Sequence, residues 1–355
     1  MMKPVNVGIL GCGAIAPAYL KNLRGPFARH LHVAACADKV PEAAARRAAE
    51  FGVPKSCSPG ELLGDPAIEI VVNLTPAPAH ATTNLAILRA GKHVFSEKPL
   101  ALTRAEGREI LQLAAAQRRE VAGAADIFLG AGLQLCRRLI DSGRIGVPVA
   151  AQGIVALAQR HSFPYHHVFR GPLLDMGPYY FTALVALLGP IVRVAGAAEI
   201  RFPEKTDPNA PGGPKTFKVE VPSTCAVSLT FAGGPVAALV VTCDVDGYFP
   251  RLEIHGTEGS LLLNDANFYG GNVVLTCGGK TEVFETAPGF SAAGRGLGLL
   301  EMAQALHDGR VPRSSGALMY HVLDAMLAVT DSSATGRHVS LESSAARPPA
   351  FEYAG

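Results

Sequence analysis

A glycine-rich turn near the N-terminus is the first feature of this sequence with the residue types and spacing for chemistry. The motif Gly11-x-Gly13-x-x-Ala16 follows an apolar run, 5–10, and opens a stretch of helical character. The glycines allow a tight turn and a close approach of the backbone to a pyrophosphate, and Ala16 allows close packing of helix on strand. Free N–H groups at the helix start would face the phosphates. The expected cofactor contacts are Gly11, Gly13, Ala14 and Ile15.

An acidic residue, Asp38, ends the second apolar run, 32–37. Its carboxylate can accept hydrogen bonds from both hydroxyls of an adenosine ribose, and it would repel a 2′-phosphate. This favours NAD over NADP as the cofactor. NADP stays open, because the adjacent Lys39 could bind that phosphate, and a solvated turn aspartate is the alternative without a ligand.

Three histidines and an arginine lie in one loop region of the second half. They are His161, His166, His167 and Arg170. A metal site needs three or four ligands in fixed geometry, and adjacent side chains of an extended segment point in opposite directions, so we expect no metal. His166 is a candidate for substrate contact, with a solvated loop as the alternative. Arg170 could bind a substrate carboxylate or phosphate in a bidentate manner, or lie at the surface.

Strand-like and helical stretches alternate from residue 5 to about residue 124. Strands are expected at 5–10, 32–37, 68–74 and 93–96, and helices at 16–23, 41–51, 80–90 and 103–117. Thr103-x-x-Glu106 is a capping box that marks a helix start, and Gly52 marks a helix end. This alternation predicts a parallel sheet with right-handed crossovers.

The pattern changes after about residue 125. Helices are expected at 129–142, 173–188, 297–307 and 316–330, a strand at 148–159, and mostly strands over 191–263 around a polar loop at 203–215. Alternation over 218–230 and the apolar run 235–245, joined by a Gly-Gly-Pro turn, predict neighbouring antiparallel strands. The fold class is therefore α/β, with a Rossmann dinucleotide-binding domain at 1–124. A second α/β domain with a large open, mainly antiparallel sheet is expected at 125–355, and the helices of 297–330 could pack back on the first domain.

Composition and charge exclude several classes of protein. Apolar residues make up 48 % of the 355 residues and charged residues 17 %, which excludes a disordered chain. The 32 basic and 30 acidic residues leave a net charge of +2, too small for a basic face that binds nucleic acid or an anionic membrane. The uncharged runs 176–192 and 221–243 contain glycine and proline, so we expect no membrane span. Seven cysteines without a C-x-x-C pair and the absence of a targeting segment favour a cytoplasmic protein.

Several motifs in a fixed order resemble one family of oxidoreductases. Glu-Lys-Pro-Leu at 97–100 closes the fourth strand, and Gly-Pro-Leu-Leu-Asp-Met-Gly-Pro-Tyr-Tyr follows at 171–180. With the N-terminal turn and with segments 128–134, 140–148 and 253–260, these motifs resemble the glucose–fructose oxidoreductase, inositol dehydrogenase and MocA (Gfo/Idh/MocA) family. The resemblance covers nearly the whole chain.

The resemblance implies an NAD(P)-dependent oxidoreductase that transfers a hydride between nicotinamide and a hydroxyl carbon of a sugar, inositol or related polyol or glycoside. Lys98 matches the family's lysine, whose bond to the following proline, Pro99 here, is commonly cis. Asp175 and Tyr179 match the family's Asp-x-Gly-x-His motif, with tyrosine at the histidine position. Thr182 stands where many members have a further aspartate.

The same resemblance implies roles for these residues. Tyr179 would exchange the proton of the reacting hydroxyl, and the Lys98 ammonium would lower the ordinary tyrosine pKa of about 10. Asp175 would accept a hydrogen bond from a neighbouring substrate hydroxyl and hold Lys98 in place. The expected substrate contacts are Lys98, His166, Arg170, Asp175 and Tyr179. The expected cofactor contacts beyond the first turn are Asp38, Thr75, Pro76, His80, Glu97 and Lys98.

Two other functions remain open at this point. Some members of the family hold NAD tightly and cleave glycosides by transient oxidation, and a few are nucleotide-sensing regulators. The joint presence of Lys98, Asp175 and Tyr179 argues against a regulator. The expected partners are a small carbohydrate or polyol and further copies of the chain, as a homodimer or homotetramer, because one face of the open sheet would leave a wide apolar surface in water.

Overall fold

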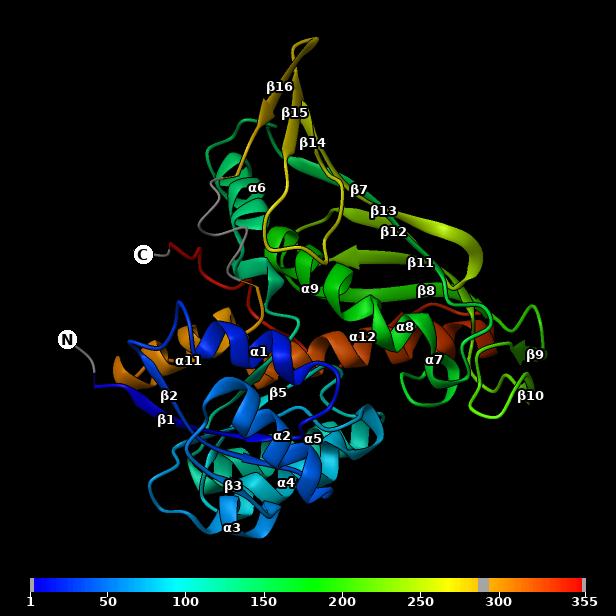
Figure 1. Cartoon of the computed structure of the whole chain (residues 1–355). Coiled ribbons are helices and arrows are strands. Elements are labelled where there is room, and N and C mark those ends of the chain that lie inside the picture. The colour runs from blue at the N-terminus through cyan, green and yellow to red at the C-terminus, as the bar shows by residue number, and fades with distance from the viewer. Residues whose placement is uncertain (1–2, 287–293, 353–355) are drawn as a thin grey trace. The chain divides into compact units, whose positions relative to one another are not determined.

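The computed structural model describes residues 3–286 and 294–352 of the chain (Figure 1). The chain divides into two compact units, and each is described by itself below. The first consists of Met1–Asp126 and Ala293–Tyr320, and the second of Ile127–Ala292 and His321–Gly355. Within the described residues, no helix is both long enough and apolar enough to cross a membrane.

A six-stranded parallel sheet forms the centre of the first unit. Its strands are β1 (Val5–Leu10), β2 (Leu31–Ala37), β3 (Ser56–Cys57), β4 (Ile70–Asn73), β5 (His93–Ser96) and β6 (Val121–Gly123). They lie in the order β3-β2-β1-β4-β5-β6, and every neighbouring pair is parallel. Residues of β1 and β4 are almost entirely buried, which explains why these strands are continuous apolar runs. The expected parallel sheet is confirmed, and the short strands β3 and β6 were not predicted.

Helices connect the strands of the first unit. They are α1 (Ala16–Leu23), α2 (Pro41–Phe51), α3 (Pro59–Gly64), the 3₁₀ helix η1 (Ala77–Ala79), α4 (His80–Arg89), α5 (Arg104–Gln117) and α11 (Leu297–His307). The predicted capping box of α5 is present, with Thr103 and Glu106 each bonded to the other's backbone N–H. Gly52 ends α2 in the left-handed conformation, as predicted. The Gly298 N–H of α11 donates to the buried Asp126 carboxylate at 2.7 Å.

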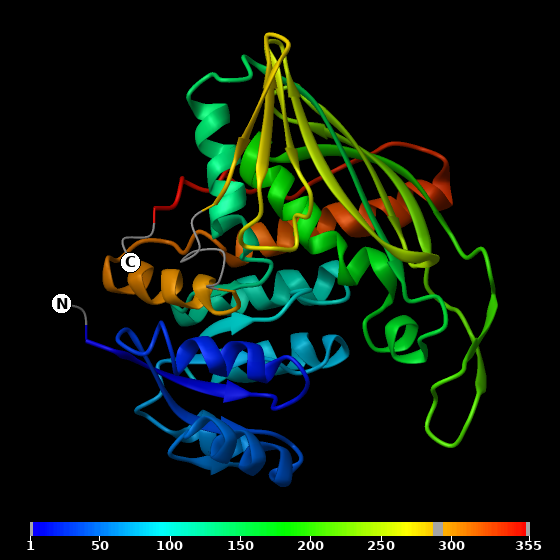
Figure 2. The same ribbon diagram turned by 45° about the horizontal axis from the view of Figure 1, so that its top comes forward.

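A nine-stranded mixed sheet dominates the second unit, drawn in green and yellow in Figure 2. Its strands are β7 (Pro148–Ala158), β8 (Ile191–Glu199), β11 (Thr224–Phe231), β12 (Val236–Thr242), β13 (Asp244–Gly256), β14 (Gly259–Leu263), β15 (Val273–Cys277), β16 (Lys280–Phe284) and β17 (Val339–Ser340). The order is β16-β15-β14-β13-β7-β12-β11-β8-β17, and only the β7–β12 pair is parallel. The expected large, mainly antiparallel sheet is therefore confirmed.

The predicted antiparallel pair of strands from 218–230 and 235–245 is confirmed as β11 and β12, but the start of the first strand and the loop at 203–215 differ from the prediction. The stretch 218–230 holds parts of two strands, because β10 (Lys215–Lys218) ends before Pro222 and β11 begins at Thr224. Proline has no N–H to donate, so it interrupts a strand ladder. The polar loop at 203–215 contains β9 (Glu204–Asp207), which pairs with β10 as a separate antiparallel hairpin.

The helix expected at 173–188 is two helices, α8 (Gly171–Asp175) and α9 (Gly177–Leu188). Pro178 lies in the first turn of α9. Its ring would clash with the carbonyl four residues earlier in a continuous helix, so the chain bends at Met176. All residues of α9 are buried, in agreement with a core helix for the uncharged run. The remaining helices are η2 (Ile127–Leu129), α6 (Ala131–Asp141), α7 (Phe163–His167) and α12 (Gly316–Thr335), which crosses the division between the units.

The two faces of the nine-stranded sheet differ in burial. On β12, Ala237, Leu239 and Val241 are buried, whereas Val236 and Val240 are 50 % and 39 % exposed. Val240 pairs with Ala226 of the adjacent strand β11, and the exposed Ala238 pairs with Ser228. One face of the sheet is thus an open surface of small and apolar side chains.

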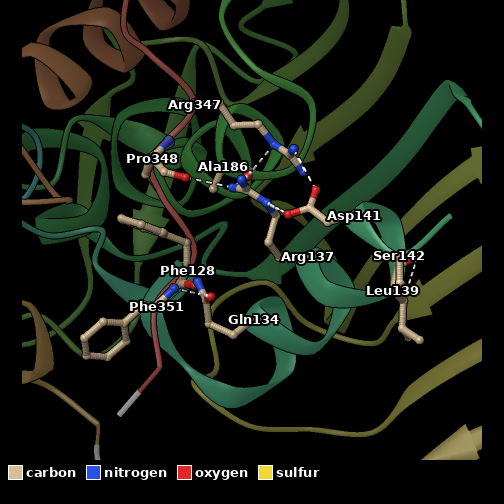
Figure 3. Close-up of polar contacts among 10 residues, drawn as sticks. All are labelled: Phe128, Gln134, Arg137, Leu139, Asp141, Ser142, Ala186, Arg347, Pro348 and Phe351. Carbon is tan, nitrogen blue, oxygen red and sulfur yellow. Dashed lines mark hydrogen bonds and ion pairs between the residues drawn. The ribbon is translucent and has the colours of Figure 1, made fainter. Parts of the chain in front are cut away.

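The segment near the C-terminus is tied to α6 and α9 by two arginines (Figure 3). Arg137 donates to Asp141 at 2.5 Å, to the Ala186 carbonyl at 3.1 Å and to the Pro348 carbonyl at 2.7 Å. Arg347 donates to the second oxygen of Asp141 at 2.8 Å. These contacts join the C-terminal segment to both α6 and α9.

Candidate functional site

The glycine-rich turn of the first unit has room for a ligand at Gly13. Gly11 has a φ of 105°, and a Cβ there would lie 2.6 Å from the backbone carbon of Leu74, so only glycine fits. A Cβ on Gly13 would meet no atom of the described chain within 4 Å, and its backbone has no positive φ. Protein packing therefore does not require glycine at this position. A phosphate group bound against the turn would require glycine here, since the backbone would have to approach it closely.

Helix α1 begins directly after this turn. Its N-cap residue, Ile15, forms no side-chain cap, so the first N–H groups of the helix are left for another acceptor. Pro17 in the first turn lacks an N–H and costs nothing there. The helix start and the open Gly13 together form a site that fits the pyrophosphate of a dinucleotide.

The Asp38 carboxylate shapes the turn from the end of β2. One oxygen accepts the Cys12 N–H at 2.7 Å and the other accepts the Val40 N–H at 2.9 Å. The side chain is half-buried, and each carboxylate oxygen can accept more than one hydrogen bond. Asp38 can thus orient the phosphate turn and still accept a ribose hydroxyl. Lys39 beside it is exposed.

The other predicted cofactor contacts of this unit follow β4 and β5, at the same edge of the sheet. Thr75 and Pro76 follow β4, and Glu97 and Lys98 follow β5. The strand order reverses between β1 and β4, and open α/β sheets bind ligands beside the carboxyl ends of strands at such a point. The first unit therefore brings together the glycine turn and the residues at the ends of three strands.

His80 is buried and holds two of these segments together. Its Nδ1 lies 2.6 Å from the Pro99 carbonyl oxygen, and its Nε2 lies 2.7 Å from the Thr75 carbonyl oxygen. Burial lowers the pKa of His80, and the two carbonyls act in the opposite direction. Both ring nitrogens are occupied by backbone oxygens, so in this structure His80 positions the cofactor edge of the sheet.

Glu97 is a buried carboxylate that accepts two hydrogen bonds. It accepts hydrogen bonds from the Tyr19 hydroxyl at 2.8 Å and the Lys98 N–H at 3.0 Å. Burial alone would raise its pKa, but the positive charges of Arg295 and Lys98 and these hydrogen bonds lower it below the ordinary value. The carboxylate is therefore ionised and fixes the backbone that carries Lys98. The Lys98–Pro99 bond is cis, as the resemblance implies.

The second unit carries the other two predicted catalytic residues. Asp175 is the last residue of α8 and is half-buried, and Tyr179 lies in the first turn of α9 and is buried. The break at Met176 places Asp175 at the end of α8 and Tyr179 in the first turn of α9. Lys98 belongs to the first unit, so the predicted catalytic residues are divided between the two units, and their roles stay a prediction.

The loop residues of the second unit have protein partners. His166 is buried, with its Nε2 3.3 Å from the Arg160 carbonyl and 3.4 Å from the Lys205 Nζ, and burial lowers its pKa to about 4. Arg170 is half-buried, and its φ of 64° is unusual for a residue with a side chain. Substrate contact by either residue stays a prediction.

Comparisons with known proteins agree with this architecture. Residues 5–123 match the family described as "Oxidoreductase family, NAD-binding Rossmann fold", and residues 133–262 match the "GFO/IDH/MocA C-terminal domain". A dTDP-3,4-didehydro-2,6-dideoxy-alpha-D-glucose 3-reductase of Saccharopolyspora spinosa is 30 % identical over 272 residues, which cover 75 % of this chain and 76 % of the reductase. The chain belongs to the Gfo/Idh/MocA oxidoreductase family. Its cofactor is NAD, in agreement with the geometry of the turn.

Other members of the Gfo/Idh/MocA family share sequence and fold with this chain. Levoglucosan dehydrogenase of Pseudarthrobacter phenanthrenivorans is 28 % identical over 291 residues, 74 % of each chain. The structure of an apo levoglucosan dehydrogenase superposes with a TM-score of 0.87 at 23 % identity, and covers 97 % of this chain and 100 % of that one. The expected fold class is thereby confirmed.

Three residues near Tyr179 were not found by the sequence analysis of this Gfo/Idh/MocA protein. Tyr165 lies close to Asp175 and Tyr179, because the charges of both affect its pKa. The Tyr248 hydroxyl donates to the buried Asp265 carboxylate, and Tyr179 lies within electrostatic range of Tyr248. These residues lie on α7, on β13 and after β14, outside any contiguous motif, so no local signal marks them.

Proposed function

We propose that this protein is an NAD-dependent dehydrogenase that oxidises one hydroxyl carbon of a neutral sugar, inositol or related polyol, or reduces the corresponding ketone. The observation that carries the proposal is the carboxyl edge of the six-stranded sheet, where the open Gly13, Asp38 and Lys98 follow three strands. Related family members support the substrate class, since they are named as oxidoreductases of levoglucosan, inositol and a deoxysugar. In this proposal the first unit holds NAD and the second unit holds the substrate.

The proposed chemistry divides between cofactor and chain. Bound NAD supplies the nicotinamide that accepts the hydride from the substrate carbon. Tyr179 accepts the proton of the reacting hydroxyl, and the Lys98 ammonium stabilises the negative charge that develops on the oxygen. Asp175 accepts a hydrogen bond from a neighbouring hydroxyl and so orients the ring. Glu97 keeps the Lys98 backbone in place through its 3.0 Å hydrogen bond.

A substrate panel with NAD and with NADP tests the proposal. The purified protein is incubated with levoglucosan, scyllo-inositol and other polyols, and the reduced nicotinamide is followed by its absorbance. We expect reduction of NAD with at least one polyol. A protein that retains NAD through purification and forms no net NADH with free polyols, but cleaves a glycoside, would contradict a simple dehydrogenase.

Two substitutions locate the chemistry. Lys98→Ala and Tyr179→Phe should each lower kcat by roughly 10²–10⁴-fold while NAD affinity changes little, because a positioned proton-transfer group contributes that much. Lys280→Ala, at an exposed position of β16, is the matched control and should leave kcat unchanged. A fully active Tyr179→Phe enzyme would move the proton-transfer role to Lys98 or to a loop histidine.

We also propose that the open face of the nine-stranded sheet is a contact between copies of the chain. Val236 and Val240 are exposed in the middle of this face, and the strand on one side presents small residues that permit close approach. Val240→Arg should therefore shift the molar mass in light scattering towards 37.0 kDa. Val311→Arg replaces a valine that is 65 % exposed in the first unit and should not change it. A wild-type mass of one chain would contradict the proposal.

The seven cysteines support a reducing compartment, which we propose is the cytoplasm. All seven carry free thiols, and five are buried. Expression of the native chain in a reducing and in an oxidising compartment would test this, since we expect folded, active protein only from the former.

A further inference from the structure

The hydroxyl of Tyr165 is a buried polar group without a hydrogen-bond partner in the described part of the chain. The residue as a whole is 5 % exposed. Buried tyrosine hydroxyls normally have a hydrogen-bond partner, because an unpaired one lowers the equilibrium constant of folding by roughly 5- to 150-fold. Phenylalanine would fill the same space without this cost, so packing alone does not explain the hydroxyl.

The surroundings of Tyr165 point to a ligand. The charge of Asp175 acts on the Tyr165 hydroxyl, and Tyr179 and Cys243 are further neighbours. Burial raises the pKa of Tyr165, and the Asp175 charge raises it further, so the phenol keeps its proton and acts as a donor. The Asp175 carboxylate is near enough to act on the Tyr165 hydroxyl as a hydrogen-bond acceptor, although no hydrogen bond of normal geometry reaches that hydroxyl from the described part of the chain. A proton donor and a carboxylate acceptor thus face the same region, beside the predicted proton-transfer residue.

The ring of Tyr165 is held in place by its own short helix, α7. Ser162 caps this helix and accepts the Tyr165 N–H at 3.3 Å. The Phe163 N–H donates to Asp207 at 3.0 Å, and the Phe163 ring stacks on His167 with a centroid distance of 4.3 Å. The hydroxyl is therefore preorganised, and a partner must come to it.

We propose that Tyr165 is a substrate-binding residue that, together with Asp175, recognises one hydroxyl group next to the reacting carbon. The Tyr165 hydroxyl donates a hydrogen bond to the oxygen of that substrate hydroxyl. The same substrate hydroxyl donates a hydrogen bond to the Asp175 carboxylate. Only an –OH satisfies both, since a carbonyl or ether oxygen cannot donate and a deoxy position can do neither. The inference rests on the proposed function and narrows its substrate class to compounds with two neighbouring free hydroxyls.

The test compares Tyr165→Phe with the wild type in two independent measurements. The first is unfolding in urea without substrate. Because the variant loses an unpaired buried hydroxyl, its equilibrium constant of unfolding should be about fivefold or more lower than that of the wild type. Tyr19→Phe is the matched control and should unfold more easily, because its buried hydroxyl donates to Glu97 at 2.8 Å. Easier unfolding of Tyr165→Phe would show that the hydroxyl has a structural partner and would overturn the inference.

The second measurement is kcat/KM with scyllo-inositol, trans-1,2-cyclohexanediol and cyclohexanol. We expect kcat/KM of Tyr165→Phe to be about tenfold lower than that of the wild type with the two compounds that have neighbouring hydroxyls, and to change little with cyclohexanol. The ratio of kcat/KM for the diols to kcat/KM for cyclohexanol should therefore fall. An equal loss with all three alcohols, or none, would overturn the inference. If the wild type oxidises none of these three, the proposed function is judged on the full polyol panel, and the inference is decided by calorimetric binding of scyllo-inositol to the NADH-loaded protein. Weaker binding of scyllo-inositol by Tyr165→Phe than by the wild type supports the inference. Equal affinity of the two proteins, or no binding by either, overturns the inference.

Discussion

Replacing Lys205 by methionine would remove the positive half of a buried ion pair in the second unit. The Lys205 Nζ lies 2.5 Å from an Asp244 oxygen, and the two side chains are 1 % and 8 % exposed. At an effective dielectric constant of about 20, the attraction at this distance is roughly 7 kcal/mol, and desolvation of the two ions offsets most of it. The variant leaves the Asp244 carboxylate buried, with the hydrogen bond from the Ser223 hydroxyl at 2.5 Å still in place. We therefore expect a loss of about 3–5 kcal/mol in the free energy of unfolding.

The assay is a double-mutant cycle. Lys205→Met, Asp244→Asn and the double variant are unfolded in urea, and hydrogen exchange of β9, β10 and α7 is measured by mass spectrometry. The double variant should lose about 2–3 kcal/mol less than the sum of the single losses, because it leaves no charge unpaired. Lys218→Met is the control, since this lysine is exposed on the same hairpin and should cost under about 0.5 kcal/mol.

The result that would refute this reasoning is a small effect of Lys205→Met. A loss of about 1 kcal/mol or less is typical of an exposed ion pair in water. It would mean that solvent reaches the pair and that the hairpin of β9 and β10 is not anchored there. Additive single losses would likewise show that the two charges do not interact.

Three further predictions concern the histidines, Glu97 and Asp38. Burial lowers the pKa of His93 and of His166 from the ordinary 6.5 to about 4, so the unfolded chain binds more protons between these values. The free energy of unfolding should therefore fall as the pH falls from 6.5 to 4, and His93→Gln should flatten this slope in urea titrations at several pH values. Glu97→Gln should cost roughly 1.5–3 kcal/mol and exceed the cost of Tyr19→Phe, because it removes a buried charge that accepts two hydrogen bonds. Asp38→Ser should weaken NAD binding and improve NADP binding by comparison, and a wild type that already prefers NADP would contradict the assignment.

The first unit could be predicted closely because its signals are contiguous in the sequence. β1, β5 and α2 have the predicted bounds, since each is a short apolar or alanine-rich run with a clear glycine or proline boundary. The cofactor turn follows from local backbone requirements, and the φ of Gly11 is one of them. The position of His80 could not be predicted in the same way. Its two carbonyl partners come from different turns, and sequence spacing does not show that they face one ring.

The second unit was harder to predict because its determinants are distant in sequence. The hairpin of β9 and β10 was interpreted as a loop, since its residues are polar and its partner strand is only four residues long. The break of the helix at Met176 was missed although Pro178 marks it, because the surrounding run is apolar enough for one long core helix. Asp175 and Tyr179 were still found, through the family motif, whereas Tyr165 belongs to no motif.

The contacts that hold Tyr165 are separate from the motif that carries the predicted catalytic residues Asp175 and Tyr179. Asp207 of the hairpin accepts the Phe163 N–H of α7, and the Lys205–Asp244 pair joins the same hairpin to the start of β13. The residues of this path lie outside the motif of Asp175 and Tyr179. We therefore expect a substitution in the hairpin to change the position of the Tyr165 hydroxyl before it changes the predicted proton-transfer residues. If Tyr165 recognises the substrate as proposed, variation among β9, β10 and α7 would alter which hydroxyl the chain recognises while the hydride chemistry stays the same.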